Sequence, residues 1–160
     1  MKYTPLSGFR QGWIFRHREL PVPEQALAAI KPLAQSSANQ FWRTSISRQA
    51  AHANHFMADG WPSHNGVWQE KENWQQQWES DYAELPPLIE DHCHWEGNTR
   101  VFFCYDIDHI IETTWAVFGR HWKNFLFYDD EPILIGKGRR QTVLFHSDGT
   151  YQVGIKPEGF

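Results

Sequence analysis

The sequence has few cysteines, no excess of basic residues and no long apolar run. Its two cysteines in 160 residues are too few for a disulfide scaffold, so we expect reduced thiols. The 15 Lys and Arg residues are outnumbered by 19 Asp and Glu residues, which argues against nucleic-acid binding because that requires a basic surface. Residues 1–8 lack the apolar core of a secretory signal, and no stretch approaches the ~18 continuous apolar residues of a membrane span. We therefore expect a cytoplasmic protein without nucleic-acid or membrane partners.

Two common catalytic motifs are also absent. There is no Gly-x-Ser-x-Gly nucleophile elbow and no phosphate-binding glycine loop of either standard type. Residues 136–138, Gly-Lys-Gly, are too short for such a loop, and no helix signal follows them. Two local basic clusters are expected to be solvated faces or turns: Arg10, Arg16, His17 and Arg18, and Lys137, Arg139 and Arg140. We expect no cofactor, and the absence of a catalytic constellation favours a protein that is not an enzyme.

Large aromatic side chains are what the chain has in excess. Hydrophobic residues make up 41% of the sequence and aromatic residues 16%, with nine tryptophans, so a folded core built on large rings is expected. A chain of 160 residues is expected to form one domain. Helical signals dominate residues 1–97, whereas strand signals dominate residues 98–160. The predicted class is α+β, with N-terminal helices packed on one face of a mostly antiparallel C-terminal sheet of four to six strands.

The N-terminal half is expected to contain four helices after a short strand or packing arm at residues 9–15. The first opens at Pro23 and ends or kinks at Pro32. The second opens with a Ser37–Gln40 capping box, and one alternative extends it to His55. The third covers residues 67–80, and the fourth starts at Pro86–Pro87.

The C-terminal half is expected to start with a central strand at residues 101–105. An aromatic helix is predicted over about residues 110–123, because its rings are spaced three, four and three apart, although residues 111–118 also suit a strand. The helical stripe is Trp115, Phe118, Trp122 and Phe125. Strands are predicted at 124–128 and 133–135, followed by a hairpin of 142–145 and 151–155.

The strongest candidate for chemistry is the tetrapeptide Asp91-His92-Cys93-His94, because imidazole and thiolate are ligands that zinc prefers. His52 and His55 are spaced as two ligands on one helix face would be. Together with residues from the tetrapeptide, they would form a four-ligand metal site. Adjacent helical residues point in different directions, so at most two of residues 91–94 converge. The favoured interpretation is therefore that there is no metal site, with Cys93 simply buried.

Acidic residues cluster around the predicted strands, and they would gather at one end of the sheet. Such a cluster would hold Mg²⁺ or act as an acid–base pair. The favoured interpretation is that they form turns and the start of the aromatic helix. The residues are Asp106, Asp108, Glu112, Asp129, Asp130 and Glu131.

Four tryptophans lie in the most polar third of the chain, where few aliphatic residues are available to pack with them. They would form a surface that binds a protein partner, since Trp is enriched at binding hot spots. Packing of the third helix against the sheet is the competing interpretation, and stacking on sugar rings is a third. The residues are Trp61, Trp68, Trp74 and Trp78.

The run of residues 111–118, with Trp122, Phe125 and the Asp129–Asp130 pair, resembles a family of small uncharacterised gammaproteobacterial proteins. Residues 3–6 and 74–79 are similar to the same family, so the resemblance covers nearly the whole chain. That family is a domain of unknown function and therefore implies no catalytic residue. A looser likeness to bacterial immunity-type domains is at the level of fold only. The sequence favours a non-catalytic protein-binding module, immunity-like or regulatory, and the alternative is a metal-dependent hydrolase-type enzyme.

Overall fold

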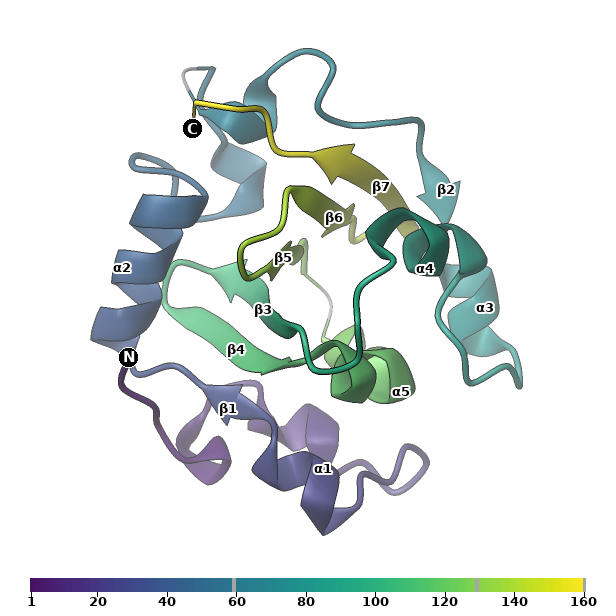
Figure 1. The fold of residues 1–160 in the computed structure, drawn as a ribbon. Coiled ribbons are helices and arrows are strands. Elements are labelled where there is room, and N and C mark those ends of the chain that lie inside the picture. The colour runs from purple at the N-terminus through teal and green to yellow at the C-terminus, as the bar shows by residue number, and fades with distance from the viewer. Residues whose placement is uncertain (59, 129, 160) are drawn as a thin grey trace.

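The apolar run at residues 101–105 forms most of a strand near the centre of a sheet (Figure 1). The computed structural model describes residues 1–58, 60–128 and 130–159. Among these residues, seven strands form one antiparallel sheet in the order β1-β4-β3-β5-β6-β7-β2. The strands are β1 (Lys31–Pro32), β2 (Glu72–Asn73), β3 (Arg100–Asp106), β4 (His109–Thr114), β5 (Ile133–Gly136), β6 (Gln141–Phe145) and β7 (Thr150–Ile155).

Helices cover both faces of this sheet. The α-helices found in the described residues are α1 (Glu24–Ala28), α2 (Gln35–Ser45), α3 (Gln75–Glu79), α4 (Pro87–Cys93) and α5 (Trp115–Phe125). Short 3₁₀ helices occur at η1 (Leu6–Gly8), η2 (Gly12–Phe15), η3 (Ala53–His55) and η4 (Trp61–Ser63). The α+β class predicted from the sequence is confirmed, and the N-terminal half also supplies the edge strands β1 and β2.

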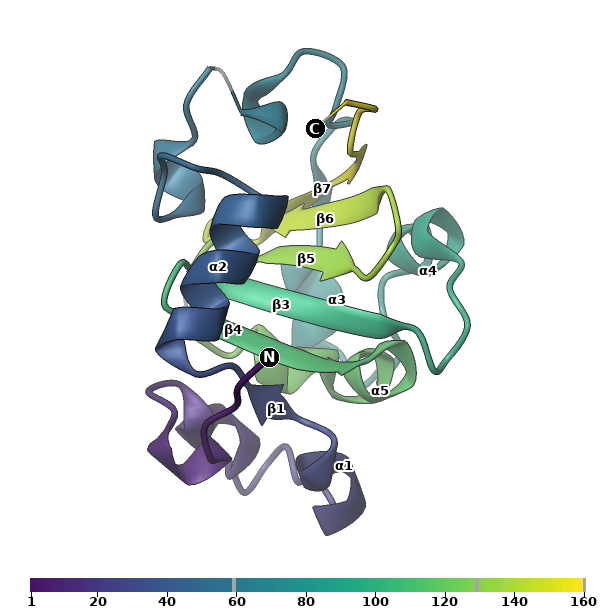
Figure 2. The ribbon, with the colours of Figure 1, turned by 60° about the vertical axis from the view of Figure 1, so that its left-hand side comes forward.

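Successive residues of β3 point to opposite faces of the sheet and so contribute to two separate cores. Phe103 belongs to a first core with side chains of α4 and α5, whereas Phe102 belongs to a second core with Trp42 of α2. Figure 2 shows α2 crossing one face while α4 and α5 lie on the other side. The expectation that the N-terminal helices cover a single face is therefore wrong, because α2 lies on one face and α4 on the other.

The aromatic stripe of α5 is confirmed as the main packing element of the first core. Its four rings are buried, with exposed fractions of 4% or less. Phe118 and Phe125 both contact the ring of Phe103 in β3, at centroid distances of 5.3 Å. The three-four-three spacing therefore identified the correct face of this helix.

The helix begins later than predicted, because residues 109–114 form β4 rather than its first turns. Ile110 and Ile111 alternate between the two cores, which is the pattern of a strand buried on both sides. Thr114 then caps the helix, since its side-chain oxygen accepts a hydrogen bond from the Val117 N–H at 3.2 Å. The strand alternative for this segment is correct as far as Thr114.

The predicted strand at residues 124–128 is wrong, because α5 continues through Phe125. The buried Asn124 amide donates hydrogen bonds to the carbonyl oxygens of Ile14 and Leu20, both at 2.9 Å. It thereby holds the N-terminal segment against the helix. Residues 9–15 form an arm rather than a strand, with Ile14 and Phe15 buried in the first core.

The first two N-terminal helices have different boundaries from those predicted. α1 ends at Ala28, and Pro32 lies in β1, where it is paired with Ile111. α2 begins at Gln35 without a side-chain cap, so the Ser37–Gln40 capping box is wrong. The Ser37 hydroxyl instead accepts a hydrogen bond from the Lys2 N–H at 2.8 Å. α2 ends at Ser45 and does not extend to His55.

The third predicted helix is mostly extended chain. Trp68 forms a bridge with Gly154, and residues 72–73 pair with β7 as strand β2, so only residues 75–79 are helical. The fourth predicted helix is confirmed as α4. The strands predicted at 101–105, 133–135, 142–145 and 151–155 are confirmed as β3, β5, β6 and β7. Among the described residues, none of the helices has the length and apolar character needed to cross a membrane.

Candidate functional site

The structure does not assemble the metal site that the sequence offered as the less favoured alternative. His52 caps η3 and His55 is its last residue, and Ala53 between them packs against the second core, whereas Cys93 of α4 is buried in the first core. The two groups of ligands are thus on opposite faces of the sheet. Within residues 1–58, 60–128 and 130–159, no three His, Cys, Asp or Glu side chains are placed to hold a metal ion. A site built from His52, His55, Asp91, His92, Cys93 and His94 is therefore wrong.

Residues 91–94 have structural surroundings instead. The His92 imidazole Nε2 forms a hydrogen bond with the Gly154 carbonyl oxygen at 2.8 Å, which ties α4 to β7. Burial raises the pKa of the Cys93 thiol to about 12, so the thiol stays protonated and is a poor nucleophile or metal ligand. His94 ends α4 in a left-handed conformation with φ of 49°.

The acidic residues divide between the two ends of the sheet. Asp106 ends β3 and Asp108 follows it, and Asp130 and Glu131 precede β5, so these four lie at one end because β3 and β5 are antiparallel. Glu112 does not join them, since it lies within β4 opposite Phe102. Asp129 lies outside the described residues. The gathering of carboxylates, which was the less favoured interpretation, thus occurs for the four residues at the sheet end and does not include Glu112.

Histidines partner two of these carboxylates. His52 Nε2 contacts Asp130 Oδ1, and His109 Nδ1 lies 2.8 Å from Asp106 Oδ1. The hydrogen bond to Asp130 raises the pKa of His52, and the nearby charges of Asp106 and Glu131 add to this effect. The Asp106 carboxylate also accepts a hydrogen bond from the Asp108 backbone N–H at 2.8 Å. This contact is typical of an aspartate in a turn, so Asp106 does not mark the start of a helix.

The four tryptophans proposed as a partner surface are divided between the two faces. Trp61 and Trp68 pack in the second core, and Trp74 and Trp78 pack against the first core. Trp61 is only 3% exposed, whereas the other three are half-buried. Each indole N–H donates to a backbone carbonyl oxygen, of Ser45, Pro62, His146 and Lys123 in turn. A binding role for these residues stays a prediction, and it would involve two surfaces rather than one.

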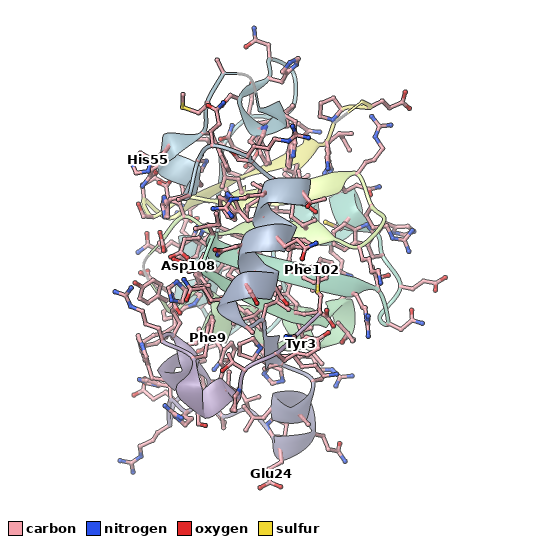
Figure 3. All side chains as sticks on the ribbon, turned by 90° about the vertical axis from the view of Figure 1, so that its left-hand side faces the viewer. Tyr3, Phe9, Glu24, His55, Phe102 and Asp108 are labelled. Atoms are coloured by element: carbon pink, nitrogen blue, oxygen red, sulfur yellow. The ribbon has the colours of Figure 1, made fainter. Side chains whose placement is uncertain are left out.

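A basic pocket lies at the end of the sheet opposite the acidic residues. Arg100 begins β3, residues 137–140 connect β5 to β6, and Lys156 follows β7, so the antiparallel order brings all of them together. They line a pocket of about 450 Å³, which is within the usual range of small-molecule sites. Figure 3 shows Tyr3 and Phe102 of this pocket on one side of α2, with Asp108 on the other side.

The pocket combines an apolar wall with an excess of positive charge. Phe41 of α2 stacks on Phe102 with ring centroids 4.2 Å apart, and Ile135 lies beside them in the wall. The described lining includes one carboxylate, that of Glu112, and five basic side chains. These are Arg100, Lys137, Arg139, Arg140 and Lys156. One third of the 15 Lys and Arg residues of an acidic protein thus surround one pocket.

Glu112 is buried and offsets only part of this charge. Its side chain is 5% exposed; Oε2 lies 3.7 Å from Arg100 Nε, and Oε1 accepts a hydrogen bond from the Tyr3 hydroxyl at 3.1 Å. Arg140 Nη1 lies 3.5 Å from Glu158 Oε1, an ion pair of which both partners are exposed and therefore weak. Lys137 has no side-chain partner among the residues that the structure describes. Three of the five cations are therefore not paired with a carboxylate there.

Lys156 is a half-buried residue of the pocket lining. Its ammonium group donates to the Ser45 carbonyl oxygen at 3.3 Å and lies 5.7 Å from the ring centroid of Trp61. Burial lowers the pKa of this lysine, because desolvation disfavours the charged form. An anion bound in the pocket would favour the charged form of Lys156 and would therefore raise its pKa again.

Comparison with known families gives one result. A family model described as a protein of unknown function, DUF2947, matches residues 3–154. The chain belongs to the DUF2947 family. No curated protein and no solved structure matches it. Membership confirms the predicted resemblance to a family of unknown function and gives no residue a role. The gammaproteobacterial origin and the likeness to immunity-type domains stay predictions.

Sequence reasoning missed the basic pocket of this DUF2947 protein because its cations are far apart in the chain. The local pattern at residues 137–140 indicates only a solvated turn, and nothing in the sequence connects Arg100 and Lys156 with it. The signal that could have linked them is the strand order. In an antiparallel sheet, the start of β3, the β5–β6 turn and the end of β7 lie at the same end. The strand positions alone do not give that order.

Proposed function

We propose that this protein is a binding module for a small organic anion, held in the basic pocket at the Arg100 end of the sheet. The observation that carries the proposal is the excess of five basic side chains over one buried carboxylate in a single pocket. Clustered cations in a partly desolvated concave site attract anions more strongly than the same charges spread over a surface. The proposal is one of binding rather than catalysis, and the predicted cytoplasmic location is part of it.

The chemistry of the lining indicates which anion fits. Arginines provide paired N–H donors that match the geometry of a carboxylate or a phosphate. The Phe41–Phe102 stack and Ile135 supply an apolar wall for the rest of the ligand. The expected ligand therefore carries a carboxylate or phosphate group on an aromatic or other apolar body. Phenyl phosphate and benzoate are matched probes that separate these two anions.

Calorimetric titration of these probes tests the proposal. Phenyl phosphate or benzoate should bind, more tightly than inorganic phosphate, and the affinity should fall as sodium chloride screens the charges. Lys137→Gln removes a cation that has no side-chain partner in the described chain, so it should weaken binding about three- to tenfold with little effect on folding. Lys71→Gln is the matched control, since it makes the same charge change at an exposed residue outside the pocket.

Two results would count against the anion pocket. One is equal weakening by Lys137→Gln and Lys71→Gln, which would indicate a non-specific effect of net charge. The other is binding that does not change with salt, which would show that the five cations do not hold the ligand.

A second proposal is the protein-binding module, immunity-like or regulatory, that the sequence predicts. It is supported by Trp13, which is 43% exposed and packs edge-on against Phe127, itself in contact with Trp78. Exposed tryptophans next to other aromatic rings are typical of interface hot spots. A partner that co-purifies with the protein should be lost with Trp13→Ala and kept with Tyr82→Ala. The reverse pattern would assign the interface to a different surface.

A further inference from the structure

A second pocket, of about 270 Å³, lies between α3 and the segment that follows α5. It is on the face of the sheet opposite α2, because its Trp74 and Trp78 pack against the first core. Four aromatic side chains line it, and all four are half-buried, so part of each remains accessible. They are Trp74, Trp78, Phe127 and Tyr128.

Both indole rings are held in place by the fold. The Trp74 N–H donates to the His146 carbonyl oxygen at 3.3 Å, and the Trp78 N–H donates to the Lys123 carbonyl oxygen at 2.8 Å. The ring of Trp78 also packs on Phe127 at a centroid distance of 5.6 Å. Because their polar edges are already satisfied, the rings offer a ligand only their π surfaces. The aromatic lining is therefore largely formed before any ligand binds.

The charge of this pocket is opposite to that of the basic pocket. Glu79 and Asp130 line it, and no Lys, Arg or His occurs among its described lining residues. Asp130 is already paired with His52, whereas the Glu79 carboxylate accepts a hydrogen bond from the neutral amide of Gln75 at 3.1 Å. The Lys123 ammonium group is directed elsewhere, since it donates to the Ser80 carbonyl oxygen at 2.8 Å. A negative charge thus remains beside the four aromatic rings.

We propose that this aromatic pocket binds the head group of a small organic cation, of the quaternary or alkylated ammonium class. The faces of aromatic rings carry negative potential, so several rings around a cation stabilise it, and a nearby carboxylate adds to the attraction. An alkylated ammonium group is weakly hydrated and offers few or no hydrogen-bond donors, which matches rings whose N–H groups are already occupied. This site shares no lining residue with the proposed anion pocket, so a result that refutes one proposal does not affect the other.

A sugar ring is the main competing ligand, because sugars also stack on tryptophan. The observation that favours the cation is the combination of four rings with an acidic lining in which the described residues include no Lys, Arg or His. A neutral sugar gains from the stacking but has no net charge to match the carboxylates. The two ligand classes are separated directly by experiment.

Calorimetric titration of the full-length protein with choline chloride is the test. The matched control ligand is dimethylbutanol, the uncharged isostere of choline in which carbon replaces nitrogen. Choline should bind, and the isostere should bind at least about fivefold more weakly, because it keeps the shape and loses the charge. Cellobiose should show no binding at this site.

Two variants locate the site. Trp74→Leu keeps an apolar side chain but removes the π surface, and Glu79→Gln removes the charge, so each should weaken choline binding about three- to tenfold. Tyr82→Leu and Glu70→Gln are the controls, since they make similar changes at exposed residues outside the pocket and should leave binding unchanged. Near-ultraviolet circular dichroism of each variant checks that it is folded. Glu79 is exposed on α3, so its variant remains informative if Trp74→Leu unfolds.

Three results would overturn the proposal. The first is the absence of binding at millimolar choline. The second is equal binding of choline and its isostere, which would reduce the site to an apolar pocket. The third is binding of cellobiose that is lost with Trp74→Leu, which would make the pocket a sugar site.

Discussion

Two glycine-to-alanine substitutions should have opposite effects on stability, because their surroundings differ. Gly154 lies in β7 under the indole of Trp68. An added Cβ would be 2.5 Å from Trp68 Cε3 and 2.8 Å from the Val67 carbonyl oxygen. The Val67 carbonyl is fixed, since it accepts the Ile155 N–H at 3.1 Å. Gly119 lies within α5, where an added Cβ would be 3.8 Å from Leu85 Cδ1, which is ordinary van der Waals contact.

The expected magnitudes follow from these distances. Forcing a methyl group into a filled site costs about 1–3 kcal/mol, so Gly154→Ala should lower the free energy of unfolding by this amount. Gly119→Ala should raise it by about 0.8–1 kcal/mol, the helix-propensity difference between the two residues. For a chain of this length, 1 kcal/mol corresponds to a change of roughly 2–4 °C in Tm.

Urea denaturation followed by tryptophan fluorescence and scanning calorimetry would measure both effects. A third variant, Trp68→Leu, separates the two clashes. In the Trp68→Leu background, the added methyl group of Gly154→Ala no longer meets the indole ring but still meets the Val67 carbonyl. Gly154→Ala should therefore destabilise the protein less in this background than in the wild type, but it should still be destabilising. If Gly154→Ala were neutral or stabilising, the close packing of residues 67–68 on β7 would be refuted. A destabilising Gly119→Ala would refute the conclusion that a methyl group fits beside Leu85 at this position.

Three further predictions concern the helix and the acidic end of the sheet. Trp115→Ala should cost about 3–5 kcal/mol as a buried aromatic truncation, and a loss below about 1 kcal/mol in denaturation would place this ring at the surface. Thr114→Ala should cost about 1 kcal/mol because Val117 loses its cap, whereas Thr114→Ser should retain most of the stability. The hydrogen bond to Asp130 raises the pKa of His52 in the folded protein above its ordinary 6.5. The protonated His52 therefore stabilises the fold fully below pH 6.5, and this stabilisation is lost as the pH rises through the pKa of His52 in the folded protein. His52→Gln should therefore be more destabilising at pH 6 than at pH 9, and an equal cost at both values would contradict the pairing.

The aromatic stripe shows what periodicity can predict. The three-four-three spacing of the rings requires one helical face, and that face is buried as predicted. The same reasoning placed the helix start too early, because Ile110 and Ile111 are apolar and continue the pattern. Periodicity does not distinguish a strand buried on both sides from the first turns of a buried helix. The β-branched residues before Trp115 were the signal for the strand.

The third predicted helix failed for a different reason. Trp74 and Trp78 are spaced as helical neighbours, and Trp78 lies on α3 with Trp74 as its N-cap, but residues 67–73 reach β7 and pair with its edge. Pairing with a distant strand provides the backbone hydrogen bonds that a local helix would otherwise provide. The local sequence pattern does not indicate which of these two structures forms. The bridge between Trp68 and Gly154 joins residues 86 positions apart.

The sequence by itself determined the α+β class, the strands β3, β5, β6 and β7 and the aromatic face of α5, because these depend on patterns within about ten residues. Only the tertiary structure decided which charges meet. Antiparallel strand order brings Arg100, residues 137–140 and Lys156 to one end of the sheet and Asp106 and Asp130 to the other. Local spacing carries no information about that order, because it is set by the packing of two cores against opposite faces of the same strands.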